Sequence, residues 1–375
     1  MSYIQHFYLQ SLPPDQPTIL PRSISLPLLR VSAVLRIPPV LTYSDTVLYN
    51  WRIAKGPAIP AASSATASTN TQSKPDLNHL RSQTTFTNTV DEEEFYLCSA
   101  RIEVRGVEAL DVMRIIMDEM FLDDEIAVRR VTEYLAKLAS VICELKALLE
   151  DVKKRCDPDR YFNNVRPWFR GEDADSVVVG YAASDPHNGE RPRRKWVFEG
   201  IEEDPELEEP AELSGPSAGQ SSMIHVLDVF LGVDHESHHS SNGPPSFITR
   251  MKTYMPYYHR SFIDHLASYP RPLRSFVLER EDEELKKAYN QAVKALKVFR
   301  DAHMIVAALY ILGPARRARE KAKGVAEAGK LEVDDARVDG KRKKPLKGTG
   351  GTDLVNFLKD TRRRTMNTVI PECTQ

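Results

Sequence analysis

The segment EDEELKKAYNQAVKALKVFRDAHMIVAALYIL, residues 281–312, sets the fold class of this chain. Its apolar residues recur at intervals of three and four, the period of a helix with one buried face. On a helical wheel, that face carries Phe299, His303, Val306, Ala307 and Tyr310. The pattern therefore predicts a long helix that turns one histidine toward the core.

A histidine in this position has two interpretations. It can be a core side chain whose imidazole is hydrogen-bonded by a carbonyl or a carboxylate, as buried polar groups usually are. It can also be an axial ligand of haem iron, with the second ring nitrogen held by an acceptor. The periodicity around His303 leaves both interpretations open.

The same helical period recurs in other parts of the chain. Residues 107–122 (VEALDVMRIIMDEMFL), 127–156 and 220–233 repeat it, so the predicted fold class is all-α. The proline-rich residues 1–57 predict only one helix, which begins near Tyr43. We therefore expect a residual small amino-terminal domain with a flexible linker over residues 1–90, and a large helical domain over residues 91–375.

Two low-complexity stretches are expected to lie outside regular structure. Residues 58–78 are small and polar, which is typical of a linker. The charged run from Ala315 to Lys347 has no sustained apolar period, which predicts a solvated loop.

Composition excludes several classes of partner. The chain has 375 residues, 41% of them hydrophobic, and 51 Lys and Arg nearly balance 53 Asp and Glu. A net charge near zero gives no reason to expect a nucleic acid or an anionic membrane as partner. The four cysteines form no CxxC pair, which favours a reducing compartment. We expect a cytoplasmic monomer without a membrane segment.

Two further motifs are ambiguous. The segment GVDHESHHSSNG contains His235, His238 and His239, but their spacing fits no closed metal site, so a loop is the favoured interpretation. The glycine-rich Gly348–Thr352 segment leads into a predicted helix whose first amides can bind an anion. It lacks the lysine of a nucleotide-binding loop, so by itself it indicates a capped helix.

Seven stretches, in order, resemble the indoleamine 2,3-dioxygenase family in its fungal form, amino-terminally shortened. They run from Pro38 onward: PPVLTYSDTVLYNW, EEEFYLCSARIE, CDPDRYFNNVRPWFRG, FEGIEEDPELEEPAELSGPSAGQSSMIHVLDVFLGV, YMPYYHRSFI, FRDAHMIVAALYILGPA and KGTGGTDLVNFLK. Each is weak alone, but their shared order and spacing make the resemblance specific.

The resemblance implies a haem site. It places His303 as the proximal ligand of the iron of haem b, and Arg300 as the partner of a haem propionate. Asp228 falls where the family has a group that supports the proximal histidine. Ser217 falls where the edge of the haem is contacted. This answers, by analogy, the question that periodicity left open for His303.

The resemblance also implies a site for an indole substrate on the opposite side of the haem. It brings together Tyr43, Thr46, Phe95, Ser99, Phe162, Arg166, Ala218 and Thr349. Aromatic rings suit an indole, and the planar fork of Arg166 suits a carboxylate. Thr349 adds a hydroxyl near backbone amides, and Ser99 is a candidate hydrogen-bond donor near the reacting atoms. Ser99 and Arg166 are therefore the expected catalytic residues.

The implied activity is the opening of the pyrrole ring of L-tryptophan by O2 to give N-formylkynurenine, the first step of the kynurenine pathway. An unidentified reductant would keep the haem reduced. Two alternatives remain at this point: a haem-binding paralogue without dioxygenase activity, acting as a sensor or partner protein, and a helical scaffold without a cofactor.

Overall fold

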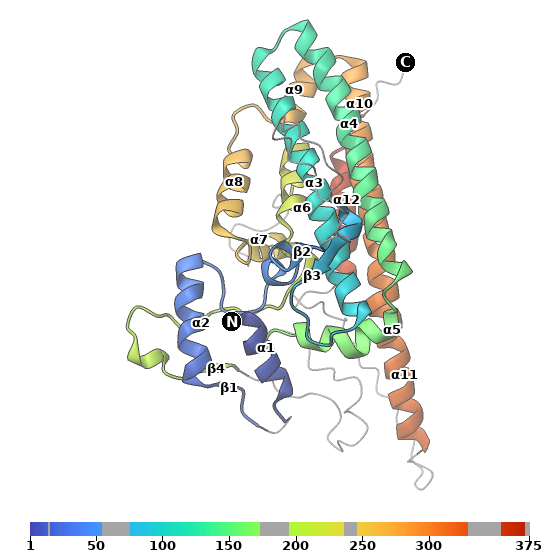
Figure 1. The fold of residues 1–375 in the computed structure, drawn as a ribbon. Coiled ribbons are helices and arrows are strands. Elements are labelled where there is room, and N and C mark those ends of the chain that lie inside the picture. The colour runs from blue at the N-terminus through green and yellow to red at the C-terminus, as the bar shows by residue number, and fades with distance from the viewer. Residues whose placement is uncertain (14–15, 55–75, 173–194, 236–245, 329–353, 372–375) are drawn as a thin grey trace, which may run out of the picture.

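A computed structural model of the protein describes residues 1–13, 16–54, 76–172, 195–235, 246–328 and 354–371. Its tallest part is an upright bundle in which α10 packs against α4 and α12, and α4 packs against α3 (Figure 1). The bounds are Val90–Leu122 for α3, Glu125–Glu150 for α4, Glu283–Ala307 for α10 and Leu354–Asn367 for α12. The predicted all-α class is confirmed, since strands in the described ranges form only two short pairs.

Capping side chains set where three of the bundle helices begin. Thr89, Asp124 and Asp282 each accept a hydrogen bond from the backbone amide three residues further on, at 3.3, 2.7 and 2.8 Å. Such caps satisfy amides that have no partner inside the helix. Asp123 takes a left-handed conformation, with φ at 60°, and turns the chain from α3 into α4.

The carboxyl-terminal end of α10 does not lead into a loop. It continues through the π-helical turn η8 (Ala308–Leu312) into α11 (Gly313–Ala328). The loop predicted from Ala315 onward is therefore wrong for its first part. Alanine, arginine and glutamate are strong helix formers, and Arg316 pairs with Glu320 one turn away at 2.8 Å. Residues 329–347 lie outside the described residues.

A second group of shorter helices packs beside the bundle, where α6 and α9 contact α3. It consists of α6 (Ser222–Leu231), α7 (Phe247–Lys252), α8 (Tyr257–Ala267) and α9 (Leu273–Arg280). α6 packs against α3, α8 and α9. Its contact with α3 is close at Gly106, where an added Cβ would lie 2.7 Å from Cε of Met223. Within the described residues, no helix combines the length and the apolar character needed to cross a bilayer.

Short turns and strands connect these groups of helices. The turns are η2 (Leu77–His79), η3 (Asp151–Lys154), α5 (Pro158–Arg160), η4 (Tyr161–Val165), η5 (Arg166–Phe169), η6 (Ile201–Glu203) and η7 (Ala218–Gln220). Strand β1 (Ile19–Leu20) pairs in parallel with β4 (Val197–Phe198), and β2 (Trp51–Ile53) pairs antiparallel with β3 (Leu80–Ser82). Most of the predicted linker, residues 58–75, falls outside the described residues.

The amino-terminal part is more helical than predicted. It contains α1 (Ser2–Ser11) and α2 (Arg22–Leu35), whereas the helix expected near Tyr43 is a single π-helical turn, η1 (Ser44–Leu48). Prolines concealed α2 in the sequence: Pro21 immediately precedes the helix, and Pro27 lies inside it. The buried side of α2 includes Leu26, Leu28 and Leu29.

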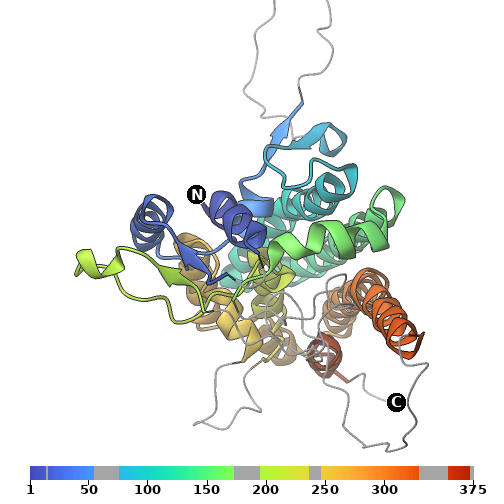
Figure 2. The same ribbon diagram turned by 90° about the horizontal axis from the view of Figure 1, so that it is seen from below.

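Helix α1 packs against segments that carry predicted substrate residues. Seen from below, it lies between α2 and the turns η4 and η5 (Figure 2). The fully buried His6 bridges two of these segments, because its Nδ1 lies 2.9 Å from the carbonyl oxygen of Trp168 and its Nε2 accepts the amide of Leu41 at 3.2 Å. Gln5 and Gln10 donate to the carbonyls of Pro39 and Arg170. Residues 1–11 are therefore tied to residues 39–41 and to the chain at η5.

Protonation of His6 at acid pH should break the bridge that its imidazole forms. Burial lowers the pKa of His6 from 6.5 to about 4, although its hydrogen bond to Trp168 opposes the shift. The unfolded chain therefore binds this proton at higher pH than the folded one. The contribution of His6 to the free energy of unfolding is largest above pH 6.5. It falls by up to about 3 kcal/mol as the pH drops toward 4.

Urea unfolding of the haem-free protein across that pH range tests this expectation. The free energy of unfolding should depend on pH less steeply in His6→Gln than in the unmodified protein, by close to one proton. His265→Gln, on the exposed side of α8, is the control and should keep the original slope. Equal slopes for the His6 variant and the unmodified protein would contradict the assignment.

Candidate functional site

The start of α6 lies in a polar cluster formed by Tyr43, Ser99, Glu103 and Ser221, here called the Tyr43 cluster. Oε1 of Glu103 accepts hydrogen bonds from the hydroxyls of Ser221, at 2.6 Å, and of Tyr43, at 2.9 Å. Burial raises the pKa of Glu103, and the two hydroxyls only partly oppose the rise. Ser221 is also the cap of α6 and accepts the amide of Ile224 at 3.4 Å.

Tyr43 is held at both ends. Its backbone amide donates to Oε1 of Gln220 at 2.8 Å, and Nε2 of Gln220 donates to the carbonyl of Gly215 at 3.0 Å. Burial raises the pKa of the Tyr43 hydroxyl and the carboxyl of Glu103 raises it further, while Ser221 and Ser99 act in the opposite direction. The structure thus brings Ser99, on α3, close to the Tyr43 hydroxyl. Thr46, one turn along η1, is buried and donates to the carbonyl of Thr42 at 3.2 Å.

Aromatic rings gather beside this cluster. The centre of the Phe95 ring lies 4.3 Å from that of Tyr161 and 6.0 Å from that of Phe169. Phe162 is buried in the next position of η4, and the guanidinium carbon of Arg166 lies 5.5 Å from the centre of its ring. Phe95, Phe162 and Arg166, which the sequence placed in one site, therefore belong to neighbouring elements that pack together.

The positive charge at this end is concentrated. The pKa of Arg170 is lowered to about 10, first by burial and then by the charge of Arg166. The two guanidinium groups therefore lie close enough for their charges to interact.

The loop before α6 runs tightly against the aromatic segment. An added Cβ at Gly215 would lie 1.9 Å from the carbonyl oxygen of Phe169, so no side chain fits there. Beyond it, the Ser217 hydroxyl accepts the amide of Gly219 at 3.2 Å, and Ala218 is exposed. Thr349 and the rest of the glycine-rich turn lie outside the described residues, although the helix predicted after that turn is present as α12.

His303 lies on α10, between the buried residues Phe299 and Ala307. Its side chain is only partly buried, and the imidazole makes no hydrogen bond to any residue that the structure describes. The pKa of His303 is lowered to about 4, first by desolvation and then by the charge of Arg300. At neutral pH the ring is therefore uncharged, which is the form that binds metals.

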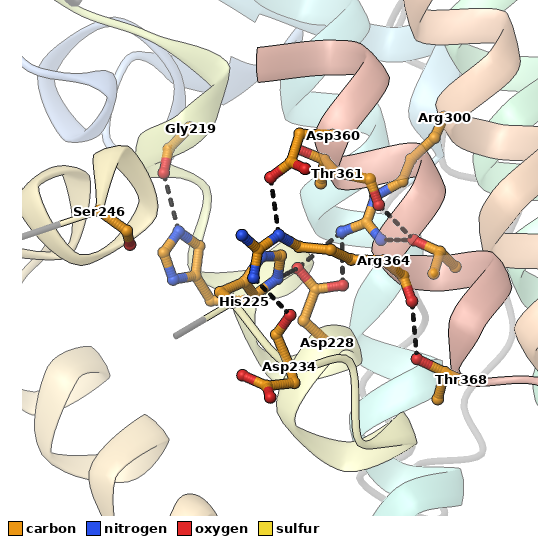
Figure 3. Close-up of polar contacts among 12 residues, drawn as sticks. Gly219, His225, Asp228, Asp234, Ser246, Arg300, Asp360, Thr361, Arg364 and Thr368 are labelled. Carbon is orange, nitrogen blue, oxygen red and sulfur yellow. Dashed lines mark hydrogen bonds and ion pairs between the residues drawn. The ribbon is translucent and has the colours of Figure 1, made fainter. Parts of the chain in front are cut away.

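Arg300, one turn before His303, belongs to a polar cluster with Asp228, His235 and Thr365, here called the Asp228 cluster. Figure 3 shows Arg300 and Asp228 facing each other. Nη2 of Arg300 lies 2.5 and 2.6 Å from the two carboxylate oxygens of Asp228, and Nη1 donates to the Thr365 hydroxyl. Nε2 of His235 lies 2.9 Å from Oδ2 of Asp228. Burial alone would raise the pKa of Asp228, but Arg300 and His235 reverse the effect and lower it.

The turn that ends α6 brings His235 back to the side of that helix. Gly232 ends the helix in a left-handed conformation, with φ at 75°, and the amide of Val233 donates to the carbonyl of Asp228 at 2.8 Å. This reverses the chain, so that a residue seven positions after Asp228 reaches its carboxylate. Arg364 of α12 holds the same turn, since Nη1 donates to the carbonyl of Asp234 at 3.1 Å (Figure 3).

Asp228 falls where the family has a group that supports the proximal histidine, and its described hydrogen bonds go to Arg300 and His235. His235 serves as the partner of Asp228, and no group of three His, Cys, Asp or Glu residues in the described ranges could hold a metal ion. His238 and His239 lie outside those ranges. Of the four cysteines, Cys98, Cys143 and Cys156 are free thiols, and Cys373 is not among the described residues.

Glu103 was missed in the sequence, although one signal could have found it. It lies four residues after Ser99, so both side chains occupy the same face of α3. A glutamate on a face otherwise turned toward predicted substrate residues is a candidate for the site.

The fold is an all-α bundle with two polar clusters on α6, one at its start and one around Asp228. This arrangement is typical of the class of helical proteins whose site lies between packed helices. The chain belongs to the indoleamine 2,3-dioxygenase family, because residues 1–368 match the family model described as "Indoleamine 2,3-dioxygenase". The resemblance seen from Pro38 onward thus extends to the first residue and includes α1.

Individual relatives agree with the family match. The chain is 30% identical to the indoleamine 2,3-dioxygenase of Saccharomyces cerevisiae, over 98% of this chain and 76% of that protein. It is also 30% identical to indoleamine 2,3-dioxygenase acdA of Aspergillus candidus, over 95% and 76% of the two chains. Indoleamine 2,3-dioxygenase 1 of Mus musculus is 28% identical, over 94% and 73%.

Proposed function

We propose that the protein is a haem-dependent dioxygenase that adds both atoms of O2 across the indole C2–C3 bond of L-tryptophan to give N-formylkynurenine. The observation that carries the proposal is the match of residues 1–368 to this family, together with the position of His303 on α10, one turn from the buried Arg300.

The residues near His303 fit a haem group. An imidazole with an available nitrogen suits the iron. A guanidinium has five N–H donors, and Arg300 uses three of them in its bonds to Asp228 and Thr365. The remaining two could meet a propionate while Asp228 keeps the guanidinium in place. Ser217, in the loop before α6, is proposed to contact the edge of the haem.

Ferrous haem, when bound, supplies the binding and activation of O2. The protein's own groups bind and orient the substrate. We assign Tyr43, Thr46, Phe95, Phe162, Ala218 and Thr349 to the indole and its side chain, and Arg166 to its carboxylate. These residues together with Arg166 are here called the substrate slot.

Orientation is the main contribution of the slot. A fixed carboxylate and a ring confined between aromatic side chains hold C2 and C3 in one position, which replaces a bimolecular encounter by a bound geometry. Helix α1 and the buried Phe162 keep bulk water away from the ring. The hydroxyl of Ser99, near that of Tyr43, can donate a hydrogen bond toward the reacting atoms. Both oxygen atoms enter the product, so turnover consumes no reductant, which is needed only to keep the iron ferrous.

Two measurements test the proposal. Purified protein supplied with haem should show a Soret band, and with a reductant, tryptophan and isotopically labelled O2 it should form N-formylkynurenine that carries two labelled oxygens. Absence of the Soret band would contradict the haem assignment. A Soret band without product would contradict the dioxygenase assignment and identify a haem-binding protein of another role.

Replacing Arg166 with lysine should lower kcat/KM for tryptophan. Lysine keeps the charge but loses the planar pair of donors, so the carboxylate is held less firmly and the ring less well placed. The loss of one charge-assisted bidentate contact is worth on the order of 2 to 3 kcal/mol, which corresponds to roughly thirty- to more than a hundredfold. Haem content, read from the ratio of Soret to protein absorbance, should not change.

Arg155→Lys is a matched control, because its side chain is exposed and its distance from Glu94 is 4.0 Å. It should keep the original kinetics. An unaltered kcat/KM in Arg166→Lys, or a loss of haem, would show that Arg166 has another role.

A further inference from the structure

We propose that Glu103 is a positioning residue of the substrate slot, which holds the hydroxyl of Tyr43 and the α6 cap Ser221 in one fixed relation. The inference rests on the proposed function, since it assigns Tyr43 to the indole. Among the described residues, the side chain of Glu103 is linked to the slot through the hydroxyls of Tyr43 and Ser221.

The geometry leaves Tyr43 little freedom. One oxygen of Glu103 accepts both the Tyr43 and the Ser221 hydroxyls, at 2.9 and 2.6 Å. The other end of Tyr43 is fixed by its amide, which donates to Gln220 at 2.8 Å. Rotation of the Tyr43 ring about χ1 would break the bond to Glu103 and leave a buried hydroxyl without that acceptor. The ring is therefore held in the orientation that forms one wall of the slot.

The carboxyl of Glu103 acts here as a hydrogen-bond acceptor for two hydroxyls. Burial raises its pKa, while the two hydroxyls act in the opposite direction. Acceptance of these hydrogen bonds requires an oxygen at this place but no charge. This separates the proposal from an alternative in which a charged Glu103 pairs with the ammonium group of the substrate.

Substitution of Glu103 separates the two roles. Glu103→Ala removes the acceptor and should lower kcat/KM for tryptophan by on the order of tenfold, the effect of a buried hydrogen bond worth about 1 to 1.5 kcal/mol. Glu103→Gln keeps an uncharged carbonyl oxygen at the same place and should restore most of that loss. Haem content should be the same in both variants. Asp111→Ala, on the exposed side of the same helix, is the control for a substitution in α3.

One readout does not depend on turnover. In thermal unfolding of the haem-free protein, Glu103→Ala and Tyr43→Phe should be non-additive, because each removes the same hydrogen bond.

The outcomes are distinguishable. An alanine variant with unaltered kinetics, additive unfolding effects, or a glutamine variant as impaired as alanine would each overturn the inference. The last result would instead support a charged Glu103. If the unmodified protein forms no product, the proposed function fails, while the unfolding results still decide whether Glu103 holds Tyr43.

Discussion

Replacing His303 with alanine should give a folded, helical protein that retains no stoichiometric haem. The side chain occupies one partly buried position in a 25-residue helix and makes no hydrogen bond to a described residue, so the loss of packing is small. The loss of the proximal ligand removes the bond that fixes the iron. The Soret absorbance per protein should therefore fall to the level of unbound haem, while the far-ultraviolet circular dichroism keeps its helical form.

His265→Ala provides the control, because His265 lies exposed on α8 and should not affect haem content. Imidazole added to His303→Ala should partly restore the Soret band, since it supplies the missing ligand to the vacated position. A normal Soret band in His303→Ala without imidazole would remove this residue from the haem site and return it to the interpretation as a core histidine.

Replacing Asp228 with alanine should destabilise the protein even without haem. The carboxylate and Arg300 are 2% and 7% exposed, so the substitution leaves a buried guanidinium whose charge is no longer compensated. Breaking such a pair from one side typically costs about 3 to 5 kcal/mol. Urea unfolding of the haem-free protein should show a loss of this order in the free energy of unfolding.

A second substitution tests the cause. In Asp228→Ala with Arg300→Met the uncompensated charge is gone, and much of the lost stability should return. Asp118→Ala, which breaks an exposed pair with Arg114 at 3.0 Å, should cost less than about 1 kcal/mol. If Asp228→Ala costs no more than this control, or if the double variant is less stable than the single one, the charge argument does not hold.

The long helices and the position of His303 could be predicted because they depend on local periodicity. The 3.6-residue period of residues 281–312 specifies both the helix and the face that includes His303. Local sequence patterns did not predict α2, because prolines precede and interrupt it. They did not predict α11, because its helix-forming residues are mostly charged.

The partners within the site could not be predicted in the same way. Glu103 meets Tyr43 and Ser221 across 60 and 118 positions of sequence, and Asp228 meets Arg300 across 72. Such pairings are decided by how helices pack, which periodicity does not encode. The family resemblance gave the identities of Tyr43 and Asp228 but not the side chains that hold them in place.

Helix α6 makes the two clusters parts of one rigid body. Its cap Ser221 is bonded to Glu103, and Asp228, seven residues or about 10 Å further along the axis, is bonded to Arg300. Under the proposed assignments, one end of the helix borders the tryptophan and the other borders the haem. Any displacement of α6 that favours one ligand is felt by the other, and thermodynamic linkage then requires that tryptophan changes the affinity for haem by the same factor by which haem changes the affinity for tryptophan.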